Sequence, residues 1–212
     1  MKIFILFNIL YLVNCFNICI IGSSSGLGKE IICQSLEKNI NVLALTNNPD
    51  KIYYPFRGNG LDENYKLKTL IKNPKLVIDN YNNNNKYLYE NLIFTTGAKP
   101  FQNDYSFQLT KKILNQKKPI LKNIILISAF GVGETLDQSN LGIKIMNNWY
   151  LKDVYEAKNK QEDFLKNYIN QNSNINLIIL RPKVLSYGEN IYNGKSRQNL
   201  AKEIIDTLSI ND

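Results

Sequence analysis

Three glycines spaced for phosphate binding lie near the start of the chain. The stretch from Ile18 to Ile31 reads ICIIGSSSGLGKEI, an apolar run that leads through glycines and serines into helix-forming residues. Such glycines let the backbone turn sharply, and the first N–H groups of the following helix can bind an anion. We predict a pyrophosphate-binding turn made of Gly22, Ser23, Ser24, Ser25, Gly26, Leu27 and Gly28. A plain strand-to-helix turn is the alternative, because a glycine triplet alone is a weak signal.

Two asparagines and a lysine follow the next apolar run. In a dinucleotide site the end of the second strand meets the adenine ribose, where an acidic residue would repel a 2′-phosphate. Here Asn47, Asn48 and Lys51 offer hydrogen-bond donors and a positive charge instead. They favour NADP(H) over NAD(H), although ordinary turn residues would have the same composition.

Small and polar residues also end two later apolar runs. The first of these runs leads into Thr96, Gly97 and Ala98, and the most apolar run of the chain leads into Ser128. A glycine at the carboxyl end of a strand permits close approach of a ligand. We expect Thr96, Gly97 and Ala98 to contact the cofactor and the Ser128 hydroxyl to lie beside it.

The absence of histidine excludes several classes of catalytic site. Without histidine the chain cannot form a Ser-His-Asp or Cys-His catalytic site or a histidine-ligated metal site. Cys15, Cys19 and Cys33 are odd in number and form no C-x-x-C pair. We therefore expect three small, buried apolar residues, without a disulfide framework or a zinc site.

Strand and helix patterns alternate along the chain. Strands are expected at residues 17–21, 41–45, 76–79, 91–95, 123–127 and 176–180. Helices are expected at residues 26–39, 62–72, 106–116, 145–169 and 196–208, and the asparagine run at 82–85 is expected to be a loop. This alternation predicts an α/β fold, a Rossmann-like three-layer sandwich with a mainly parallel, doubly wound sheet. The carboxyl ends of its strands would bring the polar residues above to one edge.

The first fifteen residues form a surplus element ahead of the expected domain. Lys2 and an apolar stretch of about ten residues have the size of a signal-peptide core, shorter than the ~20 residues that span a bilayer. We predict a signal-like or anchor segment at 1–15, for secretory or organelle entry, and one NAD(P)-binding Rossmann domain at 16–212. An interfacial or docked helix and an unused upstream start codon are the alternatives. Without such entry the protein would be cytoplasmic.

The net charge of +8 is scattered along the chain. The lysines alternate with Asn, Tyr and Ile, and no basic stripe or RNA-binding aromatic signature accompanies them. A solvated basic surface is therefore favoured over a nucleic-acid or membrane-binding module. We expect a small-molecule substrate, no nucleic-acid partner, and membrane contact only through residues 1–15, while the oligomeric state is left open.

From about Phe16 to its end, the chain resembles the short-chain dehydrogenase/reductase superfamily. The turn from Gly22 to Gly28 is similar to that of the classical members. The later features are similar to the atypical NAD(P)H-binding branch, which includes biliverdin reductase B-like proteins: Leu45 to Lys51, Ser128 to Gly133, Lys158 with Glu162, Arg181-Pro182 and Ser196-Arg197. The resemblance places Pro182 at the cofactor, and Asn47 stands where many NADP-binding members of this branch have arginine.

The resemblance implies hydride transfer from a nicotinamide at the carboxyl edge of the sheet. Ser128 matches the catalytic serine, and Lys158 matches the lysine that holds the nicotinamide ribose and lowers the pKa of a tyrosine. The position of that tyrosine is Val154 here, but Tyr155 lies three residues before Lys158 and could share its helix face. Ser128, Lys158 and Tyr155 are therefore the candidate catalytic residues. An ordinary surface pair of Lys158 with Glu162 is the alternative for the lysine.

Two functions are consistent with these residues. The first is an NAD(P)H-dependent oxidoreductase that transfers a hydride to a small planar or carbonyl substrate. The second is a non-catalytic NAD(P)-binding redox sensor or assembly factor, which the replacement of the family tyrosine by Val154 favours.

Overall fold

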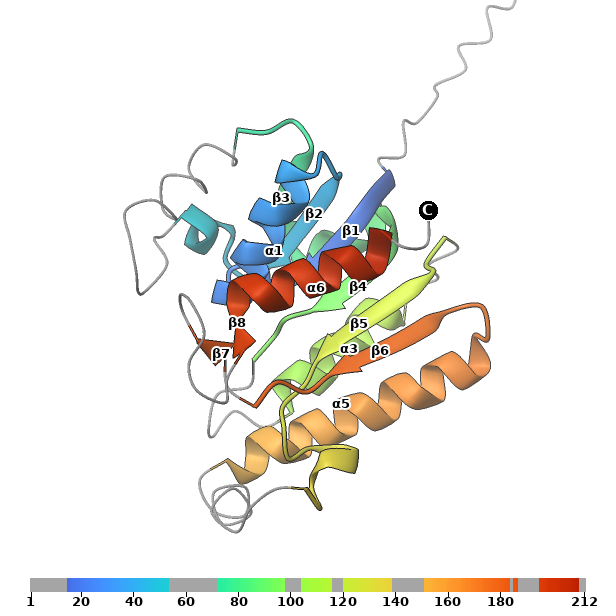
Figure 1. Cartoon of the computed structure of the whole chain (residues 1–212). Helices are drawn as coiled ribbons and strands as arrows, with labels where there is room; N and C mark the ends of the chain where they lie inside the picture. Colours follow the sequence, from blue (N-terminus) through green and yellow to red (C-terminus); the bar gives the residue numbers. More distant parts are fainter. Residues whose placement is uncertain are drawn as a thin grey trace, which may run out of the picture.

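The computed structural model describes residues 15–53, 72–97, 104–115, 120–138, 151–183, 185–186 and 195–209. Six strands form one parallel sheet in the order β3-β2-β1-β4-β5-β6. Their bounds are Cys15–Ile21 (β1), Val42–Thr46 (β2), Leu76–Asn80 (β3), Leu88–Phe94 (β4), Asn123–Ile127 (β5) and Asn176–Leu180 (β6). The arrowheads of β4, β5 and β6 point the same way in Figure 1. This strand order is that of a doubly wound dinucleotide-binding sheet, as predicted.

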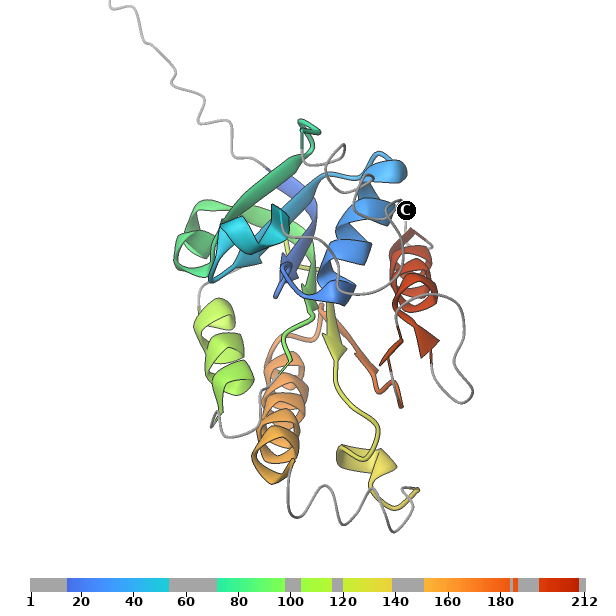
Figure 2. The ribbon, with the colours of Figure 1, turned by 90° about the vertical axis from the view of Figure 1, so that its left-hand side faces the viewer.

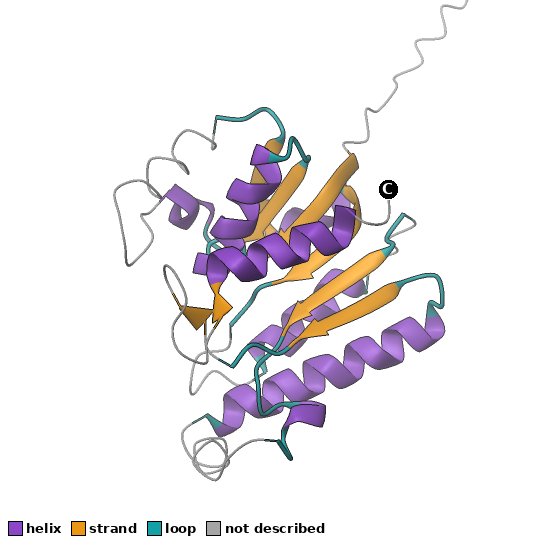
Figure 3. Ribbon diagram, in the orientation of Figure 1, coloured by secondary structure: helices purple, strands orange, loops and turns teal. Residues whose placement is uncertain are grey.

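Helices cover both faces of the sheet, which completes the predicted three-layer sandwich (Figures 2 and 3). The helices are α1 (Gly26–Glu37), α3 (Tyr105–Leu114), α5 (Lys152–Gln171) and α6 (Arg197–Ser209). Short 3-10 helices occur at Pro49–Tyr53 (η1), Tyr81–Lys86 (η2) and Gly133–Thr135 (η3), and a small second sheet pairs β7 (Leu185–Ser186) with β8 (Lys195–Ser196). In the described part of the chain no helix is long and apolar enough to cross a membrane.

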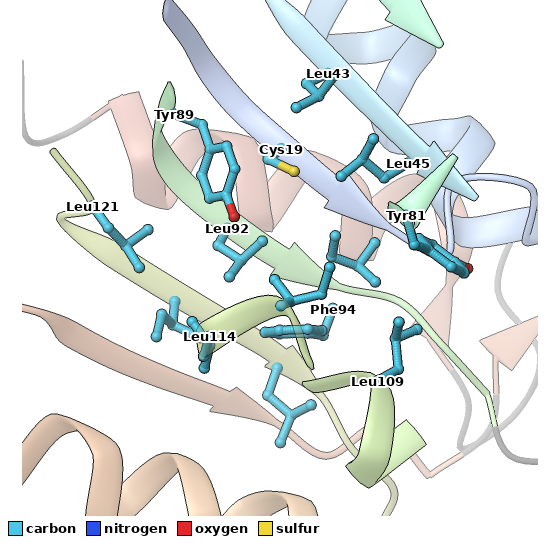
Figure 4. Packing of buried hydrophobic residues seen from close by; sticks show 14 of the residues in the cluster. Cys19, Leu43, Leu45, Tyr81, Tyr89, Leu92, Phe94, Leu109, Leu114 and Leu121 are labelled. Atoms are coloured by element: carbon cyan, nitrogen blue, oxygen red, sulfur yellow. The ribbon is translucent and has the colours of Figure 1, made fainter. Parts of the chain in front are cut away.

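The sheet is buried on both faces, because each face packs against its own pair of helices. Side chains of α1 and α6 pack on one face, and side chains of α3 and α5 pack on the other. Every residue of β2 and β5 is buried, as expected for parallel strands that read as continuous apolar runs. Figure 4 shows the second of these cores, where Leu109 and Leu114 of α3 pack beside Leu92 and Phe94 of β4.

A row of asparagines links four strands of the sheet. Asn176 Nδ2 donates to Asn123 Oδ1 at 3.1 Å, and Asn123 Nδ2 donates to Asn91 Oδ1 at 2.7 Å. Asn91 Nδ2 then donates to the carbonyl oxygen of Asn17 at 2.8 Å. The residues of this asparagine ladder are aligned across β6, β5 and β4 by the strand register. The ladder thus satisfies polar groups at the edge opposite the predicted site and favours one strand register.

Several local predictions were wrong. The asparagine run forms the 3-10 helix η2 rather than a loop, because Asn80 caps it and the buried Asn84 Oδ1 accepts a hydrogen bond from Tyr89 at 3.0 Å. Cys15 is exposed at the start of β1, whereas Cys19 and Cys33 are buried as expected. None of the three forms a disulfide within the described residues.

The long helix expected at 145–169 begins later and ends later. In the described residues it starts at Lys152 and ends at Gln171. Asn172 extends the helical end, because its Nδ2 donates to the carbonyl oxygen of Tyr168 at 2.8 Å. The expected helical residues 145–150 and 62–71, and the N-terminal residues 1–14, lie outside the described part of the chain.

Candidate functional site

Two of the three turn glycines are required by close backbone packing. Gly22 has φ +86°, and a Cβ there would lie 2.9 Å from the backbone nitrogen of Thr96. A Cβ on Gly28 would lie 2.8 Å from the carbonyl oxygen of Gly22. The turn between β1 and α1 is therefore pressed against β4 and against itself, and only glycine fits at these two positions without a shift of the backbone.

The serine side chains attach the turn to the neighbouring strand ends. Ser23 Oγ donates to the carbonyl oxygen of Leu45 at 3.0 Å, and Ser24 Oγ lies 3.0 Å from Thr46 Oγ1. Ser25 Oγ accepts from Gly28 N at 2.9 Å and caps α1. These hydroxyls, which were predicted to bind the cofactor, therefore hold the turn in place. The side chain of Leu27, also predicted to bind, is in the hydrophobic core.

Backbone N–H groups at the start of α1 remain available to a ligand. Within the described residues, the amides of Ser24, Gly26 and Leu27 have no acceptor, whereas that of Gly28 is capped. Unpaired amides at the start of a 12-residue helix can donate hydrogen bonds to an anion, and the helix dipole adds to the attraction. This part of the turn therefore fits a pyrophosphate.

The ends of β4 and β5 present two buried hydroxyls without partners. Among the described residues, Thr96 Oγ1 and Ser128 Oγ each lack a hydrogen-bond partner, and both residues are 6% exposed. A buried unpaired hydroxyl costs about 1–3 kcal/mol, which a bound ligand would recover. The space that a Cβ on Gly97 would enter is empty, so a ligand can also approach that backbone. Ala98 lies outside the described residues.

The end of β2 exposes the residues predicted to select the cofactor. Asn47 and Lys51 are exposed, and Asn48 is half-buried with its N–H bonded to Thr46 Oγ1 at 3.3 Å. The nearby acid at the end of β3 is Asp79, which is aligned with Leu45 of β2. Its carboxylate accepts hydrogen bonds of 2.6 to 2.7 Å from three groups in its own segment, those of Asn80 N, Asn83 Nδ2 and Tyr87 OH.

Lys158 is buried between two strand ends. Its Nζ donates to the carbonyl oxygens of Thr96 and Ile127 at 2.9 Å each and to Gln161 Oε1 at 3.0 Å. Burial lowers the pKa of Lys158 to about 8, and the nearby Glu162 carboxylate opposes that change. Gln161 was not predicted; it lies one turn further along the same helix face and passes the network on to Thr110 Oγ1 at 2.7 Å. Lys158 thus joins the ends of β4 and β5 to α5.

Tyr155 points to a different segment. Its hydroxyl donates to the carbonyl oxygen of Phe130 at 3.1 Å, and burial raises its pKa. A raised pKa is the opposite of what the tyrosine of the classical members needs, because it makes the phenol a weaker acid. The structure therefore separates the contacts of Tyr155 from those of Lys158, although both lie on α5.

Glu162 pairs with Arg181, and Lys158 and Glu162 are both buried, which contradicts the alternative of an ordinary surface pair. Glu162 is 1% exposed and accepts from Arg181 Nε at 3.0 Å and from Nη2 at 2.7 Å. The carboxylate raises the pKa of Arg181. A Cβ on Gly133, which has φ +54°, would lie 2.7 Å from Glu162 Oε2. The segment after β5 is therefore packed onto this ion pair.

Pro182 comes directly after Arg181 and contacts the segment that follows β5. Its carbonyl oxygen accepts from Phe130 N at 3.2 Å, and the carbonyl oxygen of Leu180 accepts from Ser128 N at 2.8 Å. The structure thus brings the turn, Thr96, Gly97, Ser128 and Pro182 to the carboxyl edge of the sheet.

Comparison with known proteins agrees with this geometry. The model of the NAD(P)H-binding family matches residues 22–204. Among solved structures, the chain is similar to ChuY, an anaerobilin reductase from Escherichia coli O157:H7 (15% identity, 90% of this chain and 89% of that chain, TM-score 0.60). It is also similar to a putative NAD-dependent epimerase/dehydratase from Bacillus halodurans (17%, 91% and 87%, TM-score 0.60) and to Gre2 of Candida albicans in complex with NADPH (12%, 91% and 65%, TM-score 0.57).

At these identities the structural likeness shows the fold, and no curated protein sequence matches the chain. The family match covers the turn, all the strand ends at the site and most of α6. The chain therefore belongs to the NAD(P)H-binding family and has a Rossmann-like fold.

Proposed function

We propose that the protein is an NAD(P)H-dependent oxidoreductase that reduces a small planar or carbonyl substrate. The observation that carries the proposal is the set of unpaired amides of Ser24, Gly26 and Leu27 at the start of α1. The unpaired hydroxyls at the ends of β4 and β5 add to it. Amides at a helix start suit a pyrophosphate, and buried hydroxyls suit the polar groups of a ligand beyond it. A bound NAD(P)H would supply the hydride.

The protein's own groups would bind and orient. The amides of the turn would hold the phosphates, and the backbone at Gly97 would let the cofactor lie close to the sheet edge. The Ser128 hydroxyl would donate a hydrogen bond to the substrate oxygen and so polarise the reacting bond. Lys158 would act by holding the ends of β4 and β5 in place. Because the Tyr155 hydroxyl donates its hydrogen bond to the carbonyl oxygen of Phe130, solvent or the substrate would supply the proton of the reaction.

The first experiment is an NADPH titration by calorimetry, followed by turnover with a panel of quinones, flavins and carbonyl compounds. Saturable binding with substrate-dependent NADPH oxidation supports the proposal. Ser128→Ala should lower turnover by about 10²-fold, the usual effect of losing one hydrogen bond to the developing charge, while NADPH binding changes little. Thr135→Ala is the matched control, since that hydroxyl already has two partners, Gly131 N and the carbonyl oxygen of Val132. An unchanged turnover in Ser128→Ala would refute the role of the serine.

We further propose that the cofactor is NADP(H) rather than NAD(H). The support is the exposed Lys51 and Asn47 at the end of β2, together with the engagement of the Asp79 carboxylate within its own segment. A 2′-phosphate would meet a cation there and no free carboxylate of β3. The test is the ratio of the dissociation constants for NADPH and NADH, and a ratio near one would contradict the preference.

The second candidate is a non-catalytic NAD(P)-binding redox sensor or assembly factor. It is favoured by Val154 at the family's tyrosine position and by the internal hydrogen bonds that occupy Tyr155 and Lys158. The sensor predicts cofactor binding without turnover across the substrate panel. Turnover with any member of the panel would exclude it.

A further inference from the structure

A cavity of about 270 Å³ lies at the carboxyl end of β6, away from the phosphate turn. Its lining comes from the end of β6 and the residues after it, and from β8 and α6. Leu180, Pro182 and Leu200 make the apolar part of the lining. The charged part is Arg181, Lys183, Lys195 and Glu203. The volume is near the lower limit, about 300 Å³, of ordinary small-molecule sites.

The three cationic side chains that line this cavity differ in whether a carboxylate of the protein already binds them. Lys195 forms an ion pair with Glu203, and Arg181 forms two hydrogen bonds with Glu162. Lys183 is exposed, and no carboxylate of the described residues lies within ion-pair distance of it. Among the residues that line the cavity, Lys183 is therefore the cation free to bind an external anion.

The cavity adjoins the segment that carries Ser128. Two of its lining residues, Leu180 and Pro182, accept main-chain hydrogen bonds of 2.8 and 3.2 Å from Ser128 and Phe130. The Lys183 ammonium lies 5.1 Å from the centroid of the Phe130 ring, so the cation leans toward the same segment. A molecule in the cavity would thus lie next to the strand end that presents the unpaired Ser128 hydroxyl.

We propose that this cavity binds the apolar body of the substrate and that Lys183 binds a carboxylate carried by that body. The inference rests on the proposed function for the reaction, but the binding it describes does not need the cofactor. An ammonium at the rim of an apolar pocket favours a molecule that joins an anionic group to an apolar part. The substrate class is therefore a small carboxylate with an aromatic or other apolar body.

The test uses 2-naphthoate and its neutral analogue 2-naphthamide as probes, titrated by calorimetry at low salt without cofactor. The wild-type protein should bind 2-naphthoate more tightly than 2-naphthamide. Lys183→Gln should weaken 2-naphthoate binding about tenfold, as expected for the loss of one charge-assisted hydrogen bond, and leave 2-naphthamide unchanged. Lys183→Arg should restore the preference for the carboxylate. The matched control is Lys111→Gln, which removes an exposed lysine 5.9 Å from another phenylalanine ring, that of Phe107.

Three results would overturn the inference. They are equal binding of the two probes by the wild type, no change of 2-naphthoate binding in Lys183→Gln, and a loss of NADPH binding in Lys183→Gln without a loss of 2-naphthoate binding. The last result would assign the cation to a phosphate of the cofactor. Failure of the proposed function would be recognised separately, as a wild-type protein that binds neither NADPH nor NADH.

Discussion

The buried position of Lys158 predicts an unusual dependence of stability on pH. Its Nζ is enclosed by the carbonyl oxygens of Thr96 and Ile127 and by Gln161, and burial lowers its pKa from 10.5 to about 8. Between these two pH values the unfolded chain holds the proton and the folded chain has released it. Stability therefore rises with pH across this window, because the unfolded state binds more protons. Each pKa unit corresponds to about 1.4 kcal/mol, so the contribution amounts to about 3 kcal/mol.

The variant Lys158→Met removes this contribution. We expect the free energy of unfolding of the wild type, minus that of the variant, to increase by about 3 kcal/mol between pH 7 and pH 10.5. The measurement is urea unfolding followed by circular dichroism at a series of pH values. Buried tyrosines such as Tyr89, whose pKa is raised by burial, destabilise both proteins at high pH and cancel in the difference.

The control for this experiment is Lys111→Met, which removes an exposed lysine of α3. Its difference from the wild type should stay nearly constant with pH. If the Lys158→Met difference is equally flat, or falls as the pH rises, Lys158 is not buried as described. The role of Lys158 as the link between β4, β5 and α5 would then be refuted.

Three further predictions concern other parts of the molecule. Asn123→Ala should lower the free energy of unfolding by about 1–3 kcal/mol in chemical denaturation, because it removes two hydrogen bonds of the ladder, each worth about 0.5–1.5 kcal/mol; Asn115→Ala, at the exposed end of α3, should change it little. Glu162→Ala should cost about 3–5 kcal/mol in the same assay, since it removes the buried carboxylate of the largely buried Arg181 and leaves only the exposed Glu134 at 3.7 Å, and a loss below 1 kcal/mol would contradict the buried pair. Lys51→Gln should weaken NADPH binding several-fold and leave NADH binding unchanged, as measured by calorimetry, and an equal effect on both would exclude a contact with the 2′-phosphate.

The sheet and its helices could be predicted because burial on both faces leaves a strong pattern. The strands at 123–127 and 176–180 were predicted with the observed bounds. The strand β4 begins three residues earlier than predicted, since Tyr89 and its neighbours interrupt the apolar run. Tyr89 is nonetheless fully buried, and its hydroxyl is satisfied by Asn84. The hydrogen bond from Tyr89 to Asn84, which a local sequence pattern does not reveal, allows β4 to include the buried Tyr89.

The positions of the candidate residues at strand ends could be predicted from the sequence, but their contacts could not. The glycine turn and the residue Ser128 follow apolar runs, so their place at the edge of a parallel sheet follows from the fold. The hydrogen-bond partners of Lys158 and Tyr155 could not be predicted in this way, because the two residues have a spacing on α5 that is also common on a surface helix. The cavity beside Lys183 is lined by residues that are far apart in the sequence, at the end of β6 and on α6, so no local sequence pattern predicts it.

The most direct test of the account is the binding of NADPH across the turn from Gly22 to Gly28. A crystal structure of the protein soaked with NADPH, combined with a calorimetric titration, measures it. The account predicts saturable binding, with the pyrophosphate on the amides of Ser24, Gly26 and Leu27 and the nicotinamide near Ser128. No saturable binding of NADPH or NADH up to millimolar concentration, or a pyrophosphate away from the start of α1, would contradict it.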